Sequence, residues 1–477
     1  MPDVSDAPSP GVSDETLASI GIPDRLETVF GPMEFFDGLP LPDTVTRGYD
    51  ALDLLRGIDI FLDCQPGATL VAMRRGLLSL GIDSRTIGYT APRCTSAPRL
   101  LTGNTETTYG MTFLALDRDG PIVIEVPEGS LSVVNDMWQR YVADMGIAGP
   151  DEGKGGKYLF LPPDHDGEVP DGYFVSRAST FSCYVLFRVL GGVESLLTTR
   201  MYPLSAAADP PEQRFVNFAD TDFAMIPAND FSFFGELDEI VQQEPPGTLD
   251  PERAGRLASI GMVPGEPFRP DDRMRSILDT AARIGSGLVR TLIYKPRDPA
   301  FYYYPGSSWK NMFPSRNHEF LSPQGARLLD ARAMFHYAAL VITPAMAAAA
   351  VGAGSQYAYT AEDSTGAWLD GGRSYTLTLP ENIPAKNFWA IDVYDTQTRS
   401  LLRTEDPYPS VHSLSDAVRA EDNGDTIIRF GPTAPQGREA NWVRTIPGKG
   451  WFTILRLYGP LESWFDQSWR PGEIEPA

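Results

Sequence analysis

The stretch GAWLDGGRSYTLTLPENIPAKNFWAIDVYDTQTRSLL, residues 366–402, decides the fold because it predicts two successive strands. In the first strand, Tyr375, Leu377 and Leu379 alternate with serine and threonine. A period of two is typical of a strand with one buried face. Pro380 ends this strand, because proline has no N–H to donate to a neighbouring strand.

The second strand of this stretch has apolar side chains on both faces. One face carries Trp389, Ile391 and Val393, and the other carries Phe388, Ala390, Asp392 and Tyr394. Successive side chains of a strand point to opposite faces. Apolar residues at both parities therefore predict a strand that is packed on two sides, as in the interior of a layered β domain.

Length and composition describe a folded chain with more than one domain. The 477 residues predict two to three domains, since a single core seldom extends beyond roughly 250–300 residues. Hydrophobic residues make up 42%, and 44 glycines with 42 prolines favour a β-rich chain with many turns. The three cysteines are far apart in sequence, which argues against a disulfide framework or a thiolate metal site.

Charge and hydropathy indicate which partners and which cellular compartment to expect. The net charge of −23 argues against nucleic acid as a partner, because a negative surface repels phosphate groups. Solubility is the simplest explanation of this charge. The sequence has no run of about 18 apolar residues, so no membrane span is predicted. Its acidic start lacks the basic and apolar regions of a signal peptide, and we expect a cytoplasmic protein.

The pattern along the chain predicts an α+β fold, mainly β, with two β-sandwich or jelly-roll-like domains and helical segments between them. The expected divisions are a flexible tail over 1–40, a β-rich domain over 41–229, a helical linking segment over 230–299 and a β-sandwich domain over 300–477. Residues 45–82 are expected to be helical with an interruption at Pro66. A further helix is expected from Val133 to Asp144, with Gly146 at its end.

Ordered motifs along most of the chain resemble those of a known family. The N-terminal motifs are LTGNTETTYG (101–110), DGPIVIEVPEG (119–129), NDMWQRYVADMG (135–146), GKGGKYLFLPPD (153–164), PDGYFVSRAST (170–180) and TTRMYPLS (198–205). The C-terminal motifs are LLDARAMFHYAALVITPAM (328–346), GAGSQYAYTAEDSTGAWLDGGRSYTLTLP (352–380), FWAIDVYDTQTRS (388–400), FGPTAPQGREANWVRTIPGKGWFTILRLYGPL (430–461) and WRPGEIE (469–475). Together they resemble bacterial proteins in which domain of unknown function 1254 precedes domain of unknown function 1214.

This resemblance implies an architecture and no particular reaction. It implies two β-sandwich or jelly-roll-like domains packed together, with the protein assembled as a homo-oligomer. Many members resemble exported proteins, whereas the present sequence predicts no leader. No reaction, substrate or cofactor is common to the family, so the chemistry has to be sought in the residues.

The motif NTETTYG is the first candidate for binding. Asn104, Thr105 and Tyr109 offer amide, hydroxyl and phenol groups before a predicted strand. Such groups can orient a polar small molecule at the mouth of a cavity. The alternative is that Asn104 and Thr105 satisfy backbone groups at a turn.

The motif LLDARAMFHYAAL is the candidate for catalysis. On a helix, Arg332 and His336 are four residues apart and share a face. His336 could act as the acid or base and Arg332 as an anion clamp. The alternative is that Arg332 pairs with a buried carboxylate while His336 packs in the core.

Aromatic side chains provide the third candidate. Tyr302 and Tyr304 share one face of a predicted strand and could stack on a flat ligand or a sugar. Core packing is the alternative. No metal site is predicted, because the four histidines do not form a ligand pattern. An acidic turn with Asp363 and Asp370 leaves a calcium site as a lesser alternative.

Three functional hypotheses follow from these candidates. The first is an enzyme, a hydrolase or lyase without an organic cofactor, that acts on a small organic molecule in a cleft between the domains. The second is a non-catalytic ligand-binding or envelope-associated module. The third is a structural oligomer. A closed polar pocket would favour the first and an exposed aromatic groove the second.

Overall fold

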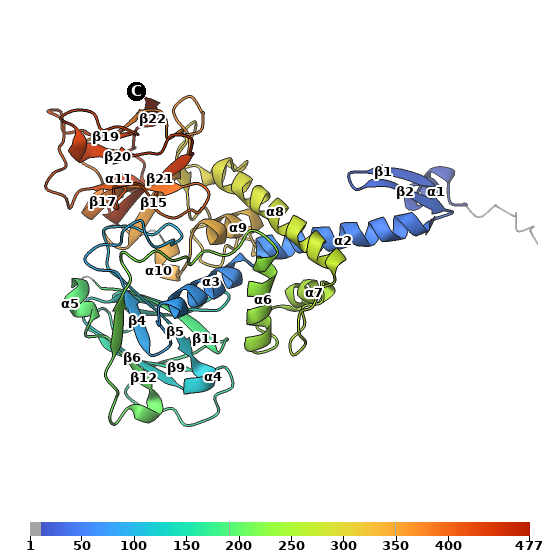
Figure 1. Ribbon diagram of the computed structural model, residues 1–477, viewed down its shortest axis with the longest axis horizontal. Coiled ribbons are helices and arrows are strands. Elements are labelled where there is room, and N and C mark those ends of the chain that lie inside the picture. The colour runs from blue at the N-terminus through green and yellow to red at the C-terminus, as the bar shows by residue number, and fades with distance from the viewer. Residues whose placement is uncertain (1–10, 190, 349) are drawn as a thin grey trace, which may run out of the picture.

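The computed structural model describes residues 11–189, 191–348 and 350–477, and it has two β-rich domains connected by helices (Figure 1). Residues 1–10 of the expected tail lie outside the described residues. The α+β class is confirmed. None of the helices in the described ranges combines the length and apolar composition that a bilayer crossing requires.

The first domain consists of two sheets packed face to face. The six-stranded sheet has the order β13 (Arg214–Asn217), β4 (Thr86–Tyr89), β5 (Tyr109–Ala115), β11 (Ser182–Arg188), β7 (Leu131–Asp136) and β8 (Tyr141–Gly146). The four-stranded sheet has the order β10 (Phe174–Arg177), β9 (Gly156–Leu161), β6 (Ile122–Val126) and β12 (Arg200–Pro203). Alternate residues such as Val185, Ile124 and Phe160 form the core between them. The opposite face of the six-stranded sheet is turned toward the second domain and the helices.

The segment expected to be a helix over 133–144 is instead the hairpin of β7 and β8. The carboxylate of Asp136 accepts hydrogen bonds from the N–H groups of Trp138 (2.9 Å) and Arg140 (2.8 Å). Between them, Gln139 has a positive φ of 54°. A turn capped by an aspartate, together with the β-branched Val133 and Val134, favours a hairpin over a helix.

The second domain repeats the two-layer design. Its five-stranded sheet has the order β14 (Lys310–Asn311), β15 (Ser355–Thr360), β21 (Trp451–Pro460), β17 (Ala385–Asp395) and β18 (Ser410–His412). Its four-stranded sheet has the order β20 (Trp442–Arg444), β19 (Thr426–Gly431), β16 (Tyr375–Leu379) and β22 (Ile474–Pro476). The two strands expected from 366–402 are thus β16 and β17, one in each sheet. As expected, β17 is buried on both faces from Trp389 to Asp395.

Helices cover the space between and beside the two domains. They are α2 (Pro42–Asp63), α3 (Gln65–Ser79), α6 (Ser232–Gln243), α7 (Pro251–Ser259), α8 (Asp272–Tyr294), α9 (Leu329–Ala338) and α10 (Pro344–Ala347). Shorter helices are α4 (Leu116–Asp119), α5 (Gly192–Leu196) and α11 (Glu462–Phe465), with 3-10 turns at 204–206, 299–301 and 439–441. Pro66 opens α3, so the interruption expected within 45–82 separates α2 from α3.

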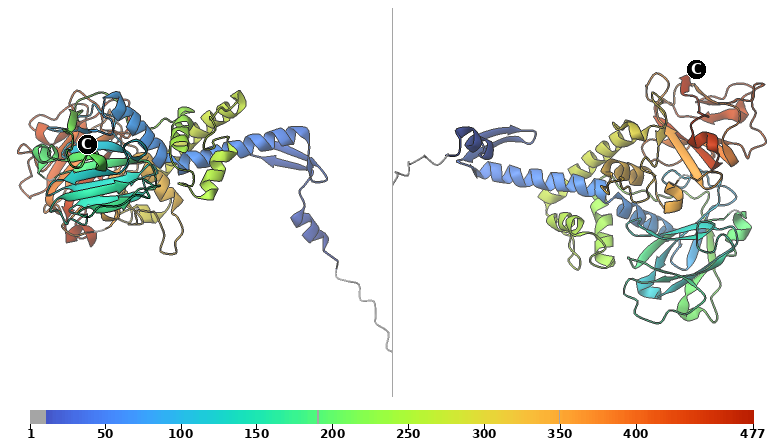
Figure 2. Two further views of the ribbon diagram at one scale, coloured as in Figure 1. Left: turned by 90° about the horizontal axis from the view of Figure 1, so that it is seen from below. Right: turned by 180° about the vertical axis from the view of Figure 1, so that it is seen from behind.

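The N-terminal arm, residues 11–55, projects away from both domains (Figure 2). It comprises α1 (Asp14–Ile20), β1 (Arg25–Thr28), β2 (Gly31–Phe36), β3 (Leu39–Pro40) and the first part of α2. The described part of the predicted tail is therefore folded. Its small sheet has no buried residue, because one layer of three short strands cannot enclose a core.

Candidate functional site

A cavity of about 340 Å³ lies between the two domains. The first domain contributes the outer face of β5, β7, β8 and β11, and the second contributes β15 and β21. Residues 339–348, between α9 and the end of α10, form a third side. The walls are mainly apolar, with Met111, Val133, Leu186, Met312, Phe313, Phe335, Met346 and Ile454 among the lining residues. Such walls with a few polar groups are typical of a small-molecule site.

Each domain places one arginine–tyrosine pair on the cavity wall. Arg188 on β11 lies directly opposite Tyr109 on β5. Arg456 on β21 lies directly opposite Tyr357 on β15. Opposite residues of antiparallel strands project from the same face of the sheet, so each pair acts as one polar unit. All four residues line the cavity.

Asn104 joins the polar groups of the two domains. Its amide nitrogen donates to the hydroxyls of Tyr109 (2.5 Å) and Tyr458 (2.8 Å), which belong to different domains. Its carbonyl oxygen accepts from the N–H groups of Glu106 (3.1 Å) and Thr107 (3.0 Å). The carbonyl oxygen of Asn104 thus makes the turn contacts of the alternative interpretation, while its nitrogen connects Tyr109, which lines the cavity, to Tyr458.

Arg456 has its charge compensated within the protein. Its guanidinium lies 2.8 Å from the carboxylate of Asp392 and donates to the hydroxyl of Tyr394 (2.7 Å). It also donates to the carbonyl of Thr102 and lies 5.2 Å from the ring centre of Tyr357. These contacts fix Arg456 as a rigid part of the wall.

Arg188 has no such compensation among the described residues. Its Nε has no hydrogen-bond partner, and the neighbours that influence its pKa are tyrosines and not carboxylates. Burial lowers the pKa of Arg188, but the hydroxyls of Tyr357, Tyr109 and Tyr458 outweigh this effect and keep it above its usual value. Arg188 therefore places a positive charge on the cavity wall that forms no ion pair with a carboxylate of the described residues.

Asp144 lies on the same face of the sheet, with β7 between it and β11. It is buried but lines the cavity. Burial raises the pKa of Asp144 to about 6, against a smaller opposite effect of the Thr343 hydroxyl. A carboxyl group with this pKa can accept or release a proton near neutral pH.

Thr105 lies at the contact between the domains and does not line the cavity. Its hydroxyl accepts a hydrogen bond from Arg93 (2.8 Å), lies 2.9 Å from the hydroxyl of Ser410 and donates to Glu106 (2.6 Å). Of the NTETTYG residues, Tyr109 reaches the cavity directly and Asn104 supports it.

Arg332 and His336 lie on α9 next to the cavity but do not line it. Arg332 forms an ion pair with Asp63 of α2, which also binds Arg253 (2.7 Å). His336 is buried beside Phe320, and burial followed by the charge of Arg253 lowers its pKa to about 3. This geometry corresponds to the structural alternative for both residues. Their catalytic roles stay a prediction.

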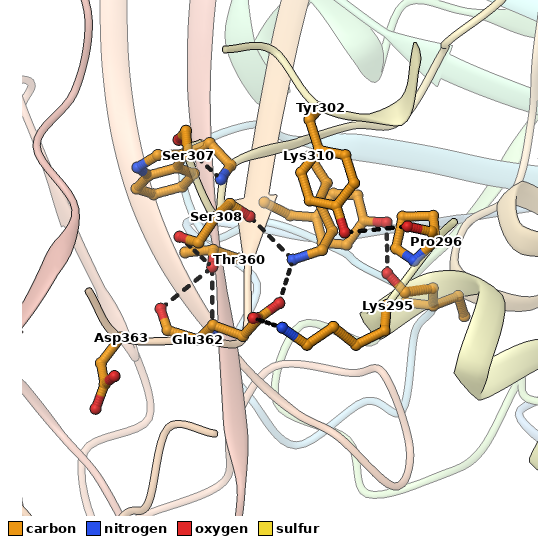
Figure 3. A network of polar contacts seen from close by, with 12 residues as sticks. Lys295, Pro296, Tyr302, Ser307, Ser308, Lys310, Thr360, Glu362 and Asp363 are labelled. Carbon is orange, nitrogen blue, oxygen red and sulfur yellow. Dashed lines mark hydrogen bonds and ion pairs between the residues drawn. The ribbon is translucent and has the colours of Figure 1, made fainter. Parts of the chain in front are cut away.

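Tyr302 and Tyr304 line a second, separate pocket of about 560 Å³ on the C-terminal domain. Tyr304 is buried, and the Tyr302 hydroxyl donates to the carbonyl of Pro296 (3.1 Å). Beside them, Glu362 binds both Lys295 and the fully buried Lys310 (Figure 3). Both lysines contact the single carboxylate of Glu362, so this network holds two positive charges against one negative charge.

No group of three or more histidine, cysteine, aspartate or glutamate residues in the described ranges could hold a metal ion. The carboxylate of Asp363 accepts hydrogen bonds from the N–H of Thr365 (2.9 Å), its hydroxyl (2.6 Å) and the N–H of Ala367 (3.1 Å). These bonds make Asp363 the cap of a turn.

Four residues of the cavity were not predicted from the sequence: Arg188, Arg456, Tyr357 and Asp144. The two arginines had a usable signal, because each is the only charge in an apolar strand segment, CYVLFRV and FTILRLY. A charge at a buried strand position needs a partner or a function. Asp144 had no such signal as long as its segment was expected to be a helix.

Two family models match parts of the chain, and solved structures are similar to it at low sequence identity. A family model described as a protein of unknown function, DUF1254, matches residues 86–201, and one described as DUF1214 matches residues 354–462. Among curated proteins, none matches the chain. The VPA0106 protein from Vibrio parahaemolyticus has 16% sequence identity and a TM-score of 0.51, covering 89% of this chain and 100% of that one. An uncharacterized protein from Burkholderia cenocepacia has 12% identity and a TM-score of 0.39, covering 91% and 96%.

Proposed function

The chain belongs to the family that combines domains of unknown function 1254 and 1214, and we propose that the two domains together bind a small organic carboxylate in the cavity between them. The observation that carries this proposal is Arg188, a charged side chain without a carboxylate partner among the described residues that lines a mainly apolar cavity. A ligand carboxylate would supply the missing negative charge, and the neighbouring tyrosine hydroxyls could donate to its oxygens.

The size of the cavity limits the ligand. A volume of about 340 Å³ equals roughly eleven water molecules at ~30 Å³ each. Carboxylates with about ten non-hydrogen atoms, such as octanoate and 3-phenylpropionate, match this volume and the apolar walls. Larger polar ligands such as oligosaccharides or nucleotides do not match either property.

The test is isothermal titration calorimetry with octanoate, 3-phenylpropionate and the uncharged control octanol. We expect both acids to bind and Arg188→Met to weaken them by roughly tenfold to a hundredfold, because a charge-assisted hydrogen bond contributes about 1.5–3 kcal/mol. Arg85→Met is the matched control, since the Arg85 side chain is 66% exposed. Equal affinities for octanoate and octanol, or an unaffected Arg188→Met variant, would contradict the proposal.

Catalysis in the same cavity, as a hydrolase or lyase without an organic cofactor, is a further step of the proposal. Asp144 supports it, since its pKa of about 6 suits proton transfer. His336 and Arg332 are the residues proposed from the sequence. Incubation with a panel of small acids and their esters, followed by NMR, would detect turnover. Turnover that survives His336→Ala but not Asp144→Asn would assign the role to Asp144.

Assembly into a homo-oligomer is the second candidate, and the N-terminal arm favours it. The arm exposes the apolar residues Val29, Phe36, Leu39, Tyr49, Leu52 and Leu55. Exposed apolar surface of this extent marks a contact surface, and we propose a second copy of the chain as the occupant, with exchanged arms in a two-fold dimer. Light scattering after size-exclusion chromatography should give a dimer that Leu52→Glu with Leu55→Glu dissociates. Leu78→Glu, at an exposed position of α3, should leave the mass unchanged.

A further inference from the structure

The cavity has two poles of opposite charge on one wall. Arg188 forms the positive pole on β11, and Asp144 forms the negative pole on β8. In the register of the sheet, Asp144 is two strands and two residues away from Arg188. With about 4.8 Å between strands and about 3.3 Å per residue, their backbones are roughly 12 Å apart. Val133 and Leu186 fill the wall between them.

Two charged residues of the cavity wall form no ion pair with any described residue. Arg456 is paired with Asp392, which leaves Arg188 and Asp144 as the unpaired guanidinium and carboxyl groups. No ion pair joins these two residues in the described part of the chain. A simple carboxylate would satisfy Arg188 but would press its apolar end against Asp144, which costs free energy when that carboxyl is ionised.

We infer that the preferred ligand is a zwitterion, an ω-amino carboxylate whose carboxylate binds Arg188 and whose ammonium group binds Asp144, with an apolar methylene spacer between them. This inference rests on the proposed function and names its substrate class. The methylene spacer of the ligand would lie along Val133 and Leu186. Each charged end of the ligand would form an ion pair with the protein in place of its hydrogen bonds to water.

Few charged or titratable groups lie near Asp144, so a pH dependence of ligand binding can be assigned to it. On its own strand, the hydroxyl of Tyr141 accepts from the N–H of Asp144 (3.1 Å), and the ring of Tyr141 contacts His318. The segment 339–348 contributes the Thr343 hydroxyl and no charged side chain. Farther along the same wall lie Arg188 and Tyr109, and across the cavity lie Arg456 and Tyr357. His318 is the one histidine among these groups and is therefore the position for a control variant.

The experiment compares octanoate with 8-aminooctanoate, which differ by the ammonium group. The amino acid should bind more tightly as pH rises through about 6, because the ammonium prefers ionised Asp144. Octanoate should bind more tightly as pH falls through the same range, because its methyl end prefers the neutral carboxyl. At pH 8 we expect the wild type to prefer 8-aminooctanoate by about tenfold or more. Asp144→Asn should remove this preference and both pH dependences.

The controls separate this inference from the proposed function. His318→Gln should keep the pH dependence of the wild type. If octanoate binds in an Arg188-dependent manner but 8-aminooctanoate binds no better at pH 8, or if Asp144→Asn keeps the preference, the zwitterion is excluded while the carboxylate site stands. If neither acid binds, both proposals are overturned.

Discussion

Asp144 and Arg188 lie on the same face of the six-stranded sheet, with strand β7 between them, and no ion pair joins them. Both strands are held by regular pairing on either side of β7, so the backbones cannot move together without breaking the sheet. The fold thereby keeps a carboxyl group and a guanidinium group apart inside one cavity. Because both groups are unpaired, they lower the free energy of unfolding of the empty protein. A ligand that bridges them would raise it again.

The first prediction concerns Asn104, which is 1% exposed and joins the two domains. Asn104→Ala should lower the free energy of unfolding by about 2–4 kcal/mol, because it leaves several buried donors and hydroxyls without partners at about 1–3 kcal/mol each. Urea denaturation measures this change. Thr107→Val is the control, since it removes only the hydroxyl bond to Asn104 (2.9 Å) and should cost about 0.5–1.5 kcal/mol. Equal losses in the two variants would contradict the bridging role.

The second prediction concerns the pH dependence that His336 causes. Its folded pKa is about 3, below the ordinary value of 6.5, so the unfolded chain binds the proton more strongly. The stabilising contribution is complete above pH 6.5 and is lost as pH falls towards 3, at up to about 1.4 kcal/mol per pH unit. His336→Leu should therefore lose less stability than the wild type between pH 7 and pH 4.5 in denaturant titrations. Parallel curves would contradict the lowered pKa, because they would mean that His336 binds its proton equally well in the folded and the unfolded chain.

The third prediction concerns Lys310, whose side chain is fully buried and lies 2.8 Å from Glu362. Lys310→Met should destabilise the protein by about 1–3 kcal/mol, because it removes the fully buried one of the two cations that contact Glu362 and leaves only Lys295. The double variant Lys310→Met with Glu362→Leu should recover a large part of this loss. Urea denaturation of the two single variants and the double variant completes the cycle. Additive losses would mean that the two residues do not interact.

Local patterns in the sequence were sufficient for part of this structure. The alternation in Tyr375–Leu379 and the double-sided Trp389–Asp395 correctly predict β16 and β17, since each depends on the burial of one strand. Asn104 and Tyr109, two of the predicted binding residues, are hydrogen-bonded to each other, and Tyr109 lines the cavity. The predicted roles of these residues in binding await the titrations above.

The rest depends on contacts between distant segments. Arg188 and Arg456 become cavity residues only when β11 and β21, more than 250 residues apart in sequence, belong to sheets that face each other. Asp144 was not predicted as a cavity residue because residues 133–144 were expected to form a helix. The turn that makes them a hairpin depends on hydrogen bonds to the Asp136 side chain, which an analysis of apolar spacing does not detect. Strand pairing of this kind is a tertiary property and overrides local propensity.

The last prediction concerns Glu236 on α6, a buried carboxyl outside the cavity. Burial raises its pKa to about 8, while the N–H of Ala228 (3.3 Å) opposes this only partly. Because the folded pKa lies above the ordinary value of 4.5, the folded chain binds the proton more strongly, and stability falls as pH rises from 4.5 to 8. The slope is up to about 1.4 kcal/mol per pH unit.

Glu236→Gln keeps the shape of the side chain and removes the titration. It should be more stable than the wild type at pH 8, with the difference disappearing near pH 4.5, in thermal and urea unfolding. Glu252→Gln, at an exposed position of α7, is the matched control and should differ little from the wild type at either pH. A Glu236→Gln variant that is less stable than the wild type at pH 8 would mean that the ionised carboxylate has a partner that stabilises the fold.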